Sequence, residues 1–573
     1  MLVCLIFKDL LLERAVGMSE VCVELVGKLV GEMLGLSKEE LSPSDNLISL
    51  GLGSLDIMRI AGLLTKNGCN VTFSELVSNP CMASWVNFAR ERSARSSSNG
   101  SPLLGSANYS KGDPFPITSV QHAYMVGRRD GQELGGTACH AYMEFECGSL
   151  DAAKLERAVE LLILRHPMLR ARFSDDGTAR IEDKVTWKGL TTYRVEGAGN
   201  PDSRIEGIRQ ELSHLRFDIE QDDLIDVRLT VVSPKRTIMH INVDLLAADV
   251  LSIQVLLEDL AHLYDGTDLA PIEIDFMEYA RRTGIGEDAR NEDREYWLNR
   301  IDNMPGGPSL PLKAPMESVK RSQFTRMEYL IDSKSWKNFT EKGRQIGVTQ
   351  SMGIAAVYAK ALSRWSEDKK FLLNLPLFNR KPIHPDVDKI VSDFTSLILL
   401  EADCANAISL LELASQMQGR FQQDVAHSSF GAVEVLRELS HRCPNDPKKA
   451  PVVFASNIGT QFISNKVEDV FGPLSKMLAE TPQVLLDHQI YDHKNGLLLA
   501  WDYVSELLDD KIAKQMFEAY CTAVRFYCEN DWSEPFPDLL PPSQRAARAE
   551  ANSEGADLGG GTLHGRFFAR AQA

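Results

Sequence analysis

The sequence predicts an α+β chain in which a small all-helical domain precedes a much larger domain of mixed strands and helices. Residues 19–34 repeat apolar side chains at helical spacing, and further short helix-like segments continue to about residue 93. From residue 115 to about residue 540, strand-like and helix-like segments alternate without a break of linker composition. This stretch exceeds one ordinary domain core, so we expect it to form two lobes.

Changes of composition mark the borders of these units. The stretch between the two domains is rich in Ser and Gly and poor in apolar residues, which is typical of a flexible tether. A charged stretch at 284–299 is the expected seam between the lobes. The predicted units are an N-terminal extension (1–17), the helical domain (18–93), the tether (94–113), the large domain (114–541, with lobes of about 114–283 and 284–541) and a linker toward a further domain (542–573).

Composition excludes several classes of function. The net charge of −18 lacks the surplus of Lys and Arg that binding to nucleic acid needs, so we expect no nucleic acid partner. The apolar start at residues 1–7 is too short to span a bilayer, and we expect no membrane span. The ten cysteines are scattered without metal-ligand spacing, which predicts reduced thiols, no metal site and a cytoplasmic protein.

A polar cluster lies where a strand-like run ends and a helix-like run begins. Residues 237–243 alternate apolar and polar side chains, and residues 251–260 carry apolar ones at helical spacing. Between them Asp244, Asp249 and Ser252 form a D-x-x-x-x-D-x-x-S pattern. Local chemistry alone does not decide between a catalytic cluster and a structural one in which Asp249 caps the helix and Asp244 pairs with an arginine.

A second motif lies in the helical domain. Ser54 follows Gly51 and Gly53 and precedes a helix-like run. A serine there is exposed at the positive end of a helix, where a phosphate group is favoured. For an isolated G-x-G-S pattern, a plain helix N-cap is the simpler interpretation.

The surroundings of Ser54 favour the phosphate interpretation. With four short helices in about 75 residues, the domain resembles acyl and peptidyl carrier domains. The pattern N-L-I-x-x-G-L-x-S-L-x-x-M-R at residues 46–59 most resembles the aryl carrier proteins of siderophore synthetases. The resemblance implies that a phosphopantetheinyl transferase attaches 4′-phosphopantetheine to Ser54. Gly53 departs from the pattern, because those carriers usually have Asp at this position.

The large domain resembles the heterocyclization domains of nonribosomal peptide synthetases. The resemblance rests on several blocks that occur in the family's order. They are residues 115–128 (FPITSVQHAYMVGR), 165–170 (RHPMLR), the Asp244/Asp249/Ser252 signature, 305–312 (PGGPSLPL), 349–365, 392–397 (SDFTSL), 451–457 (PVVFASN) and 481–487 (TPQVLLD). An amide-forming condensation domain would carry H-H-x-x-x-D-G at the signature, whereas here Leu245 replaces the second histidine and cannot transfer a proton.

The family implies a fold and a reaction. Two chloramphenicol-acetyltransferase-like lobes form a V, and carriers deliver their thioesters from opposite faces of a tunnel. The amine of a cysteinyl, seryl or threonyl thioester attacks the donor acyl thioester. The side-chain SH or OH then adds to the new amide carbonyl, and loss of water gives a thiazoline or oxazoline.

The family also implies roles for individual residues. Asp487, assisted by Gln483, is the group expected to take and give protons, since burial raises a carboxyl pKa toward neutrality. The family pairs this aspartate with a threonine that is replaced by Ala455 here. Ser456, Asn457 or Thr395 are the candidates to supply the missing hydroxyl or polar contact. Asp244, Asp249 and Ser252 are assigned mainly to architecture.

These expectations combine into one hypothesis and two alternatives. In the main hypothesis, a stand-alone aryl-adenylating ligase loads a salicyl or 2,3-dihydroxybenzoyl group onto the arm at Ser54. This group is joined to Cys, Ser or Thr on a downstream carrier of the same synthetase, which lies beyond an adenylation domain. The product is then closed to a ring. In the first alternative, Ala455 restricts the domain to amide formation. In the second, the domain is a catalytically silent module that only positions carriers.

Overall fold

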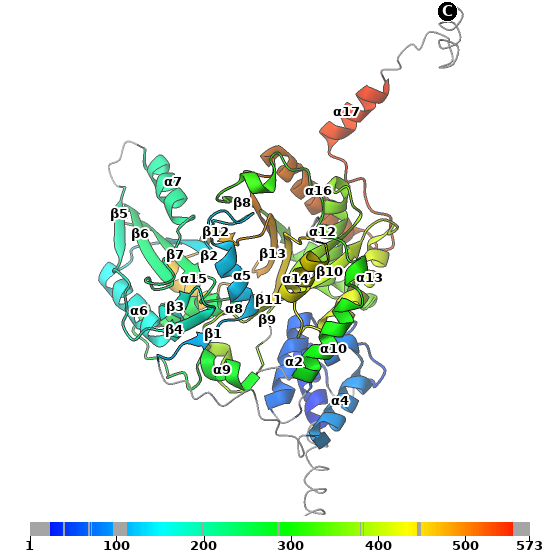
Figure 1. The fold of residues 1–573 in the computed structure, drawn as a ribbon, viewed down its shortest axis with the longest axis horizontal. Helices are drawn as coiled ribbons and strands as arrows, with labels where there is room; N and C mark the ends of the chain where they lie inside the picture. Colours follow the sequence, from blue (N-terminus) through cyan, green and yellow to red (C-terminus); the bar gives the residue numbers. More distant parts are fainter. Residues whose placement is uncertain are drawn as a thin grey trace, which may run out of the picture.

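The computed structural model of the protein describes residues 23–37, 40–66, 69, 71–95, 112–195, 200–283, 287–378, 380–381, 383–443 and 448–553. The expected N-terminal extension, nearly all of the tether and the end of the expected terminal linker lie outside these residues. Within them a helical domain lies beside a two-lobed α+β domain whose lobes spread apart as a V (Figure 1). The predicted fold class is confirmed.

The helical domain packs its helices around a small apolar core. Val26, Ile57, Leu64 and Trp85 are fully buried in it, and the Trp85 indole donates to the Leu76 carbonyl at 2.9 Å. Its helices are residues 23–34, α2 (Ser54–Lys66), α3 (Phe73–Ser78) and α4 (Met82–Arg95).

The cysteines match the predicted reduced state with one exception. Seven cysteines of the described residues are free thiols, but Cys69 is in a disulfide bond. The expectation of reduced thiols is wrong for Cys69, because the side chain lies in the buried core, where spacing along the sequence does not reveal its neighbours.

The N-lobe is built on a five-stranded sheet of order β12-β2-β7-β6-β5. One of its edge strands, β12 (Leu474–Glu480), comes from the part of the chain expected in the other lobe and pairs antiparallel with β2. One strand from the later part of the chain therefore completes the N-lobe sheet. The other strands are β2 (His140–Cys147), β5 (Thr191–Arg194), β6 (Ile225–Ser233) and β7 (Arg236–Asp244), and a small sheet holds β1 (Phe115–Pro116), β4 (Thr178–Ile181) and β3 (Ala171–Ser174).

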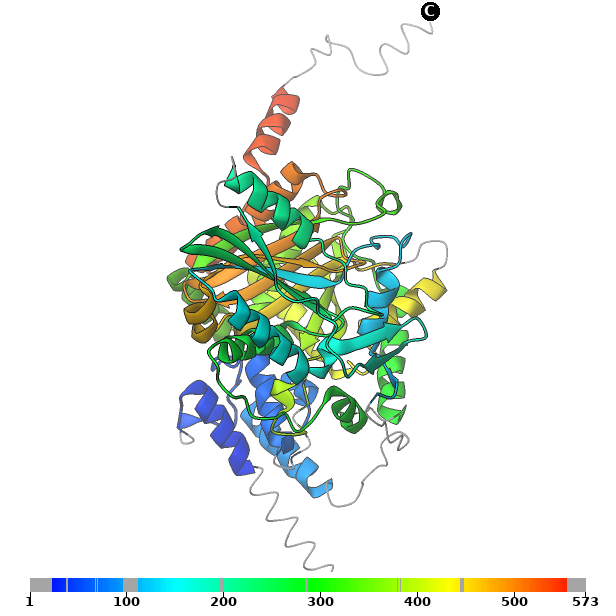
Figure 2. The ribbon, with the colours of Figure 1, turned by 90° about the vertical axis from the view of Figure 1, so that its left-hand side faces the viewer.

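Helices cover this sheet and join it to the rest of the chain. Helices α6 and α8 pack against each other, and Figure 2 shows the N-lobe strands crossing in front of the C-lobe sheet. The helices are α5 (Ser119–Gly127), α6 (Ala152–Arg165), α7 (Pro201–Leu212), α8 (Val250–Tyr264), α9 (Phe276–Thr283) and α15 (Asn465–Phe471). Helix α10 (Glu287–Leu298) follows them in the chain and lies against the C-lobe, where Trp297 donates to the His427 carbonyl at 2.9 Å.

The C-lobe is built on a six-stranded sheet of order β10-β9-β11-β13-β14-β8. Strand β11 pairs parallel with β13 and β9, and the remaining pairs are antiparallel. The strands are β8 (Phe324–Asp332), β9 (Lys370–Phe378), β10 (Thr395–Asp403), β11 (Val452–Gln461), β13 (Leu486–His493) and β14 (Gly496–Val504). The helices are α11 (Ser333–Gln345), α12 (Gln350–Trp365), α13 (Leu410–Ala426), α14 (Ala432–Arg442), α16 (Asp510–Glu529) and the projecting α17 (Pro542–Ser553).

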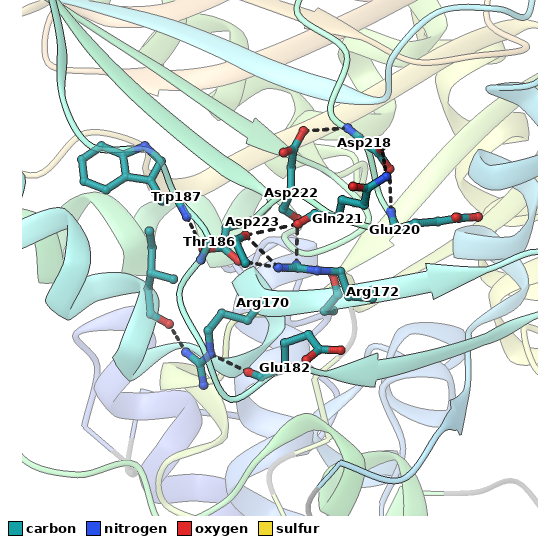
Figure 3. Close-up of polar contacts among 12 residues, drawn as sticks. Arg170, Arg172, Glu182, Thr186, Trp187, Asp218, Glu220, Gln221, Asp222 and Asp223 are labelled. Carbon is teal, nitrogen blue, oxygen red and sulfur yellow. Dashed lines mark hydrogen bonds and ion pairs between the residues drawn. The ribbon is translucent and has the colours of Figure 1, made fainter.

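A buried ion-pair network holds the N-lobe loops around the R-H-P-M-L-R block (Figure 3). The Arg172 guanidinium donates to Asp223 Oδ1 at 2.8 Å and to Thr186 Oγ1 at 2.9 Å. The other oxygen of Asp223 accepts from the backbone N–H groups of Thr186 and Trp187 at 2.6 and 2.9 Å. Arg170 donates to the Glu182 carbonyl at 2.9 Å. Arg172 pairs with Asp223, and Arg170 bonds only backbone carbonyls, so these side chains hold loops together.

The helical domain docks on the C-lobe, beneath its sheet in Figure 1. Helix α3 packs on α13, and Ser78 Oγ donates to the Gln422 carbonyl at 3.0 Å. Arg59 of α2 donates to the carbonyl of Gly459, at the end of β11, at 3.5 Å. Helix α2 therefore lies close to the end of β11.

Among the described residues, no helix is both long and apolar enough to cross a membrane, and no cluster of three or more His, Cys, Asp or Glu is placed to hold a metal ion.

Candidate active site

A cavity of about 540 Å³ lies between the two lobes. The N-lobe lines it with Tyr124 of α5 and with Leu245 and Asp249 beside α8. The crossover before β10 contributes Asp393, and Thr395 begins that strand. Strands β11 and β13 contribute a row of side chains from the C-lobe, namely Val453, Ala455, Asn457, Asp487, Gln489 and Tyr491.

Alternate residues of β13 place three polar side chains on the cavity face, as the two-residue period of a strand requires. Gln489 Nε2 donates to Asp487 Oδ2 at 2.5 Å. Gln489 Oε1 accepts from Arg326 at 2.9 Å and from the Tyr491 hydroxyl. These two donors fix the amide orientation, so its NH₂ group faces Asp487. Gln489 and Tyr491 were not predicted as site residues, although they follow Asp487 at the two-residue spacing of one strand face.

Asp487 is buried, and its charged form is disfavoured. Burial is the largest cause of the raised pKa of Asp487. The carboxylate of Asp502, which lies opposite Asp487 on the neighbouring strand β14, raises this pKa further. The Gln489 hydrogen bond and Arg326 act in the opposite direction, and the resulting pKa of Asp487 is about 7. Asp487 Oδ1 is buried without a hydrogen-bond partner in the described part of the chain. Such a carboxyl group can both give and take a proton near neutral pH.

Asp502 lies beneath the cavity, where burial raises its pKa and the neighbouring Arg326 guanidinium acts in the opposite direction. It is fully buried and accepts from Arg326 Nε at 2.7 Å and from Nη2 at 2.5 Å. The two-point pairing with a guanidinium holds both side chains in one geometry. Arg326 thus links the Asp502 carboxylate to the Gln489 amide and through it to Asp487.

The first aspartate of the signature is structural. Asp244 is fully buried and accepts from Arg128 Nη1 at 3.0 and 2.7 Å through its two oxygens. Its Oδ1 also accepts from the Leu246 N–H at 3.0 Å, which closes the turn after β7. The predicted pairing of Asp244 with an arginine is confirmed.

The second aspartate and the serine of the signature connect the lobes. Asp249 caps α8, with Oδ1 accepting from the Ser252 N–H at 2.7 Å, as predicted. Arg380, in the crossover between β9 and β10, donates to Asp249 Oδ1 and to Ser252 Oγ at 2.9 Å each. Ser252 Oγ donates in turn to the Ser392 carbonyl at 2.7 Å. The signature thus holds a C-lobe segment against the N-lobe.

The other predicted site residues divide into two groups. Thr395 and Gln483 line the cavity, as Asp487 does. Gln483 has φ of 64°, a strained conformation for a residue other than glycine, and its N–H donates to the Leu134 carbonyl of the N-lobe at 2.7 Å. Ala455 lies on the cavity wall and pairs in register with Gln489.

The structure does not bring Ser456 to the cavity. The side chain lies on the opposite face of β11, where Ser456 Oγ is 2.7 Å from Ser351 Oγ of α12. As β11 is buried on both faces, its sequence shows no polar alternation that would have revealed this orientation. The expectation that Ser456 supplies a hydroxyl next to Asp487 is therefore corrected, and Asn457 is the polar β11 residue on the cavity wall.

Ser54 opens helix α2 as predicted, although its side chain lies outside the described part. Gly51 before it has φ of 120°, and the Gly53 N–H donates to Asp56 Oδ2 at 2.9 Å. A phosphodiester group on Ser54 would lie at the positive end of this 13-residue helix, so the local backbone fits the expected 4′-phosphopantetheine.

Comparisons with known proteins cover both domains. The condensation domain family matches residues 115–530, and the phosphopantetheine attachment site family matches residues 24–89. The phenyloxazoline synthase MbtB of Mycolicibacterium paratuberculosis is 35% identical over 557 residues, which are 95% of this chain and 47% of that protein. The pyochelin synthetase PchE of Pseudomonas aeruginosa is 34% identical over 556 residues, 96% of this chain and 38% of that protein.

Solved structures agree with these matches. The cyclization-docking bidomain of the nonribosomal peptide synthetase EpoB from Sorangium cellulosum has a TM-score of 0.67 at 30% identity, covering 74% of this chain and 87% of that one. The synthetase FmoA3 has a TM-score of 0.69 at 28% identity, covering 83% and 49%. The chain spans about half the length of the curated relatives or less. It belongs to the condensation-domain family of nonribosomal peptide synthetases, as a cyclization domain preceded by a phosphopantetheine carrier domain.

Proposed function

We propose that this chain joins an aryl thioester, salicyl or 2,3-dihydroxybenzoyl, to a cysteinyl, seryl or threonyl thioester and closes the product to a thiazoline or oxazoline. One relative is named phenyloxazoline synthase, and a phenyloxazoline contains an aryl ring attached to an oxazoline. This name supports an aryl donor and a hydroxyl acceptor. The observation that carries the proposal is the Asp487 carboxyl group in the cavity between the lobes, with its pKa near 7 and one free oxygen.

Asp487 serves two steps of this reaction. As a carboxylate it takes a proton from the amine that attacks the donor thioester, while the sulfur of the broken C–S bond receives a proton and leaves as a thiol. In ring closure, the side-chain SH or OH adds to the amide carbonyl, and its proton passes to the carbonyl oxygen. The protonated carboxyl group then donates to the hydroxyl that leaves as water, and the ring nitrogen loses its N–H proton as the C=N bond forms. Gln489 and Gln483 hold the oxygen in place.

Ser54 is the proposed attachment point of 4′-phosphopantetheine, which a phosphopantetheinyl transferase installs. The bound arm supplies the thioester that holds the acyl group. We propose that this carrier is the donor, because helix α2 lies close to the end of β11, one of the strands that line the cavity. Arg59 contacts Gly459 at the end of β11, and the Asp56 carboxylate raises the pKa of Asp492 near the end of β13, after the larger contribution of burial.

The proposed partners follow from the thioester chemistry. The donor acid has to be activated as an adenylate, which we assign to a stand-alone aryl-adenylating ligase. The amine arrives on a downstream carrier of the same synthetase, loaded by its adenylation domain.

A second candidate function is amide formation without ring closure. It is favoured by Ala455, which places a methyl group beside Gln489 where the family has a threonine hydroxyl. Both functions use Asp487 in the condensation step, so they differ only in the final loss of water.

The test is the intact mass of the product. The phosphopantetheinylated chain is incubated with salicylate, ATP, an aryl-adenylating ligase and either a cysteinyl or a seryl carrier. A ring product, lighter than the amide by one water, supports the proposal. The amide alone supports the second candidate. Absence of any joined product, with both carriers shown to be loaded, would leave a module that only positions carriers.

A further inference from the structure

A second carboxyl group faces the cavity and has no part in the proposed function so far. Asp393 lies in the crossover between β9 and β10 and is 1% exposed. Its Oδ1 accepts from the Thr395 N–H at 3.0 Å. Its Oδ2 is buried and has no hydrogen-bond partner in the described structure. A buried polar atom of this kind in a substrate cavity calls for an explanation, such as a ligand or a proton.

The signature motif anchors the backbone on both sides of Asp393. Before it, the Asp249 N–H and Ser252 Oγ both donate to the Ser392 carbonyl, at 3.1 and 2.7 Å. The Ser392 N–H donates back to Ser252 Oγ at 3.1 Å. After it, the Phe394 N–H donates to Asp249 Oδ2 at 3.4 Å. The first turn of α8 therefore fixes where the Asp393 carboxyl group can point.

An arginine reinforces this anchor. Arg380 bonds Asp249 and Ser252, and its guanidinium lies 4.2 Å from the centre of the Phe394 ring. The charge of Asp249 is thus paired, whereas Asp393 Oδ2 has no hydrogen-bond partner among the described residues, and neither do Ser392 Oγ and Arg380 Nε of the same cluster.

Asp393 and Asp487 act on the same part of the cavity. Both carboxylates raise the pKa of the Tyr124 phenol and of the Cys139 thiol, for which burial is the larger cause. Tyr124 itself lines the cavity together with the two aspartates. The two carboxyl groups therefore approach one reaction space from different elements, the β9–β10 crossover and β13.

The pKa of Asp393 is also raised to about 7. Burial is the main cause, and the Asp249 charge adds to it, while hydrogen bonds from Thr395 act in the opposite direction. The titratable or charged groups around it are Asp249 of α8, Arg380 of the crossover, Tyr124 of α5, and Cys139 before β2. At neutral pH one of the two aspartates can be protonated while the other is ionised.

We propose that Asp393 is the second proton-transfer group of ring closure, and that Asp249 and Ser252 serve to position it. The inference rests on the proposed function. Loss of water from the ring hydroxyl needs an acid and a base at once. One carboxylic acid gives its proton to the hydroxyl, the C–O bond breaks, and water leaves. The other carboxylate takes the N–H proton as the C=N bond forms. One water is lost, and the proton returns between the carboxyl groups through solvent.

The experiment compares two substitutions in the same crossover. Asp393→Asn removes the proposed group, and Asp388→Asn makes the same chemical change at an exposed side chain. Each full-length holo-protein is loaded with salicylate by the ligase, supplied with a cysteinyl carrier, and followed by product mass across pH 5 to 9. We expect Asp393→Asn to keep amide formation, to lower the ratio of ring to amide by about 10²-fold or more, and to lose one limb of the bell-shaped pH profile. Asp388→Asn should match the parent.

Two further variants keep the test decisive even if Asp393→Asn fails to fold. Asp393→Glu should retain both limbs of the pH profile at a lower rate. Thr395→Val removes a hydroxyl that lowers the pKa of Asp393, so the Asp393 limb should move to higher pH. An unchanged ring-to-amide ratio and pH profile in Asp393→Asn, or an unmoved limb in Thr395→Val, would overturn the inference. A parent protein that forms no ring would instead refute the proposed function.

Discussion

Two buried aspartates, one in the N-lobe network and one in the cavity, differ in how completely their oxygens are bonded. Asp223 is 3% exposed, and both of its oxygens accept hydrogen bonds, from Arg172 and from two backbone N–H groups. Asp487 is 7% exposed, faces another carboxylate and leaves one oxygen unbonded. The first carboxylate is paired with a guanidinium and holds loops together. The second is disfavoured as an ion and is suited to proton transfer.

The same substitution at both positions separates these roles, and Asp487→Asn should have the largest effect. An amide cannot give or take the proton, so ring formation should fall by 10² to 10⁴-fold, about 3–5 kcal/mol in activation free energy. The folded protein should be retained. The ring product is measured by mass from the loaded chain and a cysteinyl carrier. Unchanged ring formation would remove Asp487 from the mechanism.

Asp223→Asn should act on stability alone. It leaves the buried Arg172 guanidinium without its counter-charge, and breaking such a pair costs about 3–5 kcal/mol. Urea unfolding measures the loss, and the ring-to-amide ratio of the remaining folded protein should equal that of the parent. A changed product ratio at unchanged stability would contradict the distinction between the two aspartates.

The pH dependence of stability sharpens the contrast. The pKa of Asp487 is raised from an ordinary value of 3.8 to about 7, so between these values the folded state binds more protons than the unfolded state. Its stabilising contribution is complete below about pH 4 and is lost as pH rises through 7. Asp487→Asn should therefore flatten the fall in unfolding free energy between pH 4 and 7, by about 1–4 kcal/mol. Urea titrations at several pH values check this, and equal slopes in both proteins would contradict it.

Ala455→Thr should have the smallest effect. In register with Gln489, a threonine hydroxyl would lie beside the polar row of β13 and could bond the leaving oxygen. One such hydrogen bond contributes about 1 kcal/mol, so ring closure should accelerate several-fold while amide formation stays constant. Ala455→Val, with a similar shape and no hydroxyl, is the matched control. Equal rates for the two variants would show that the hydroxyl has no role.

Most of the fold was predictable, since the blocks around Asp244 and Asp487 have characteristic residues and occur in the family's order. The orientation of single side chains was harder to predict from the sequence. In β11 both faces are buried, so Ala455, Ser456 and Asn457 give no pattern that reveals which of them face the cavity. Pairing across the lobes, as in β12 or between Asp249 and Ser392, depends on contacts distant in sequence that local spacing does not encode.

The passage of the chain from β12 in the N-lobe to β13 in the C-lobe couples the position of the lobes to the site. Strand β12 is bonded into the N-lobe sheet up to Glu480, and β13 enters the C-lobe sheet at Leu486. The connection 481–485 is short, and the Gln483 backbone in its middle is tied to Leu134 of the N-lobe. This connection, directly next to Asp487, is one of the places that must adjust to a change in the angle between the lobes. If the V opens or closes when a carrier arrives or departs, the Asp487 carboxyl group would thus change its position in the cavity.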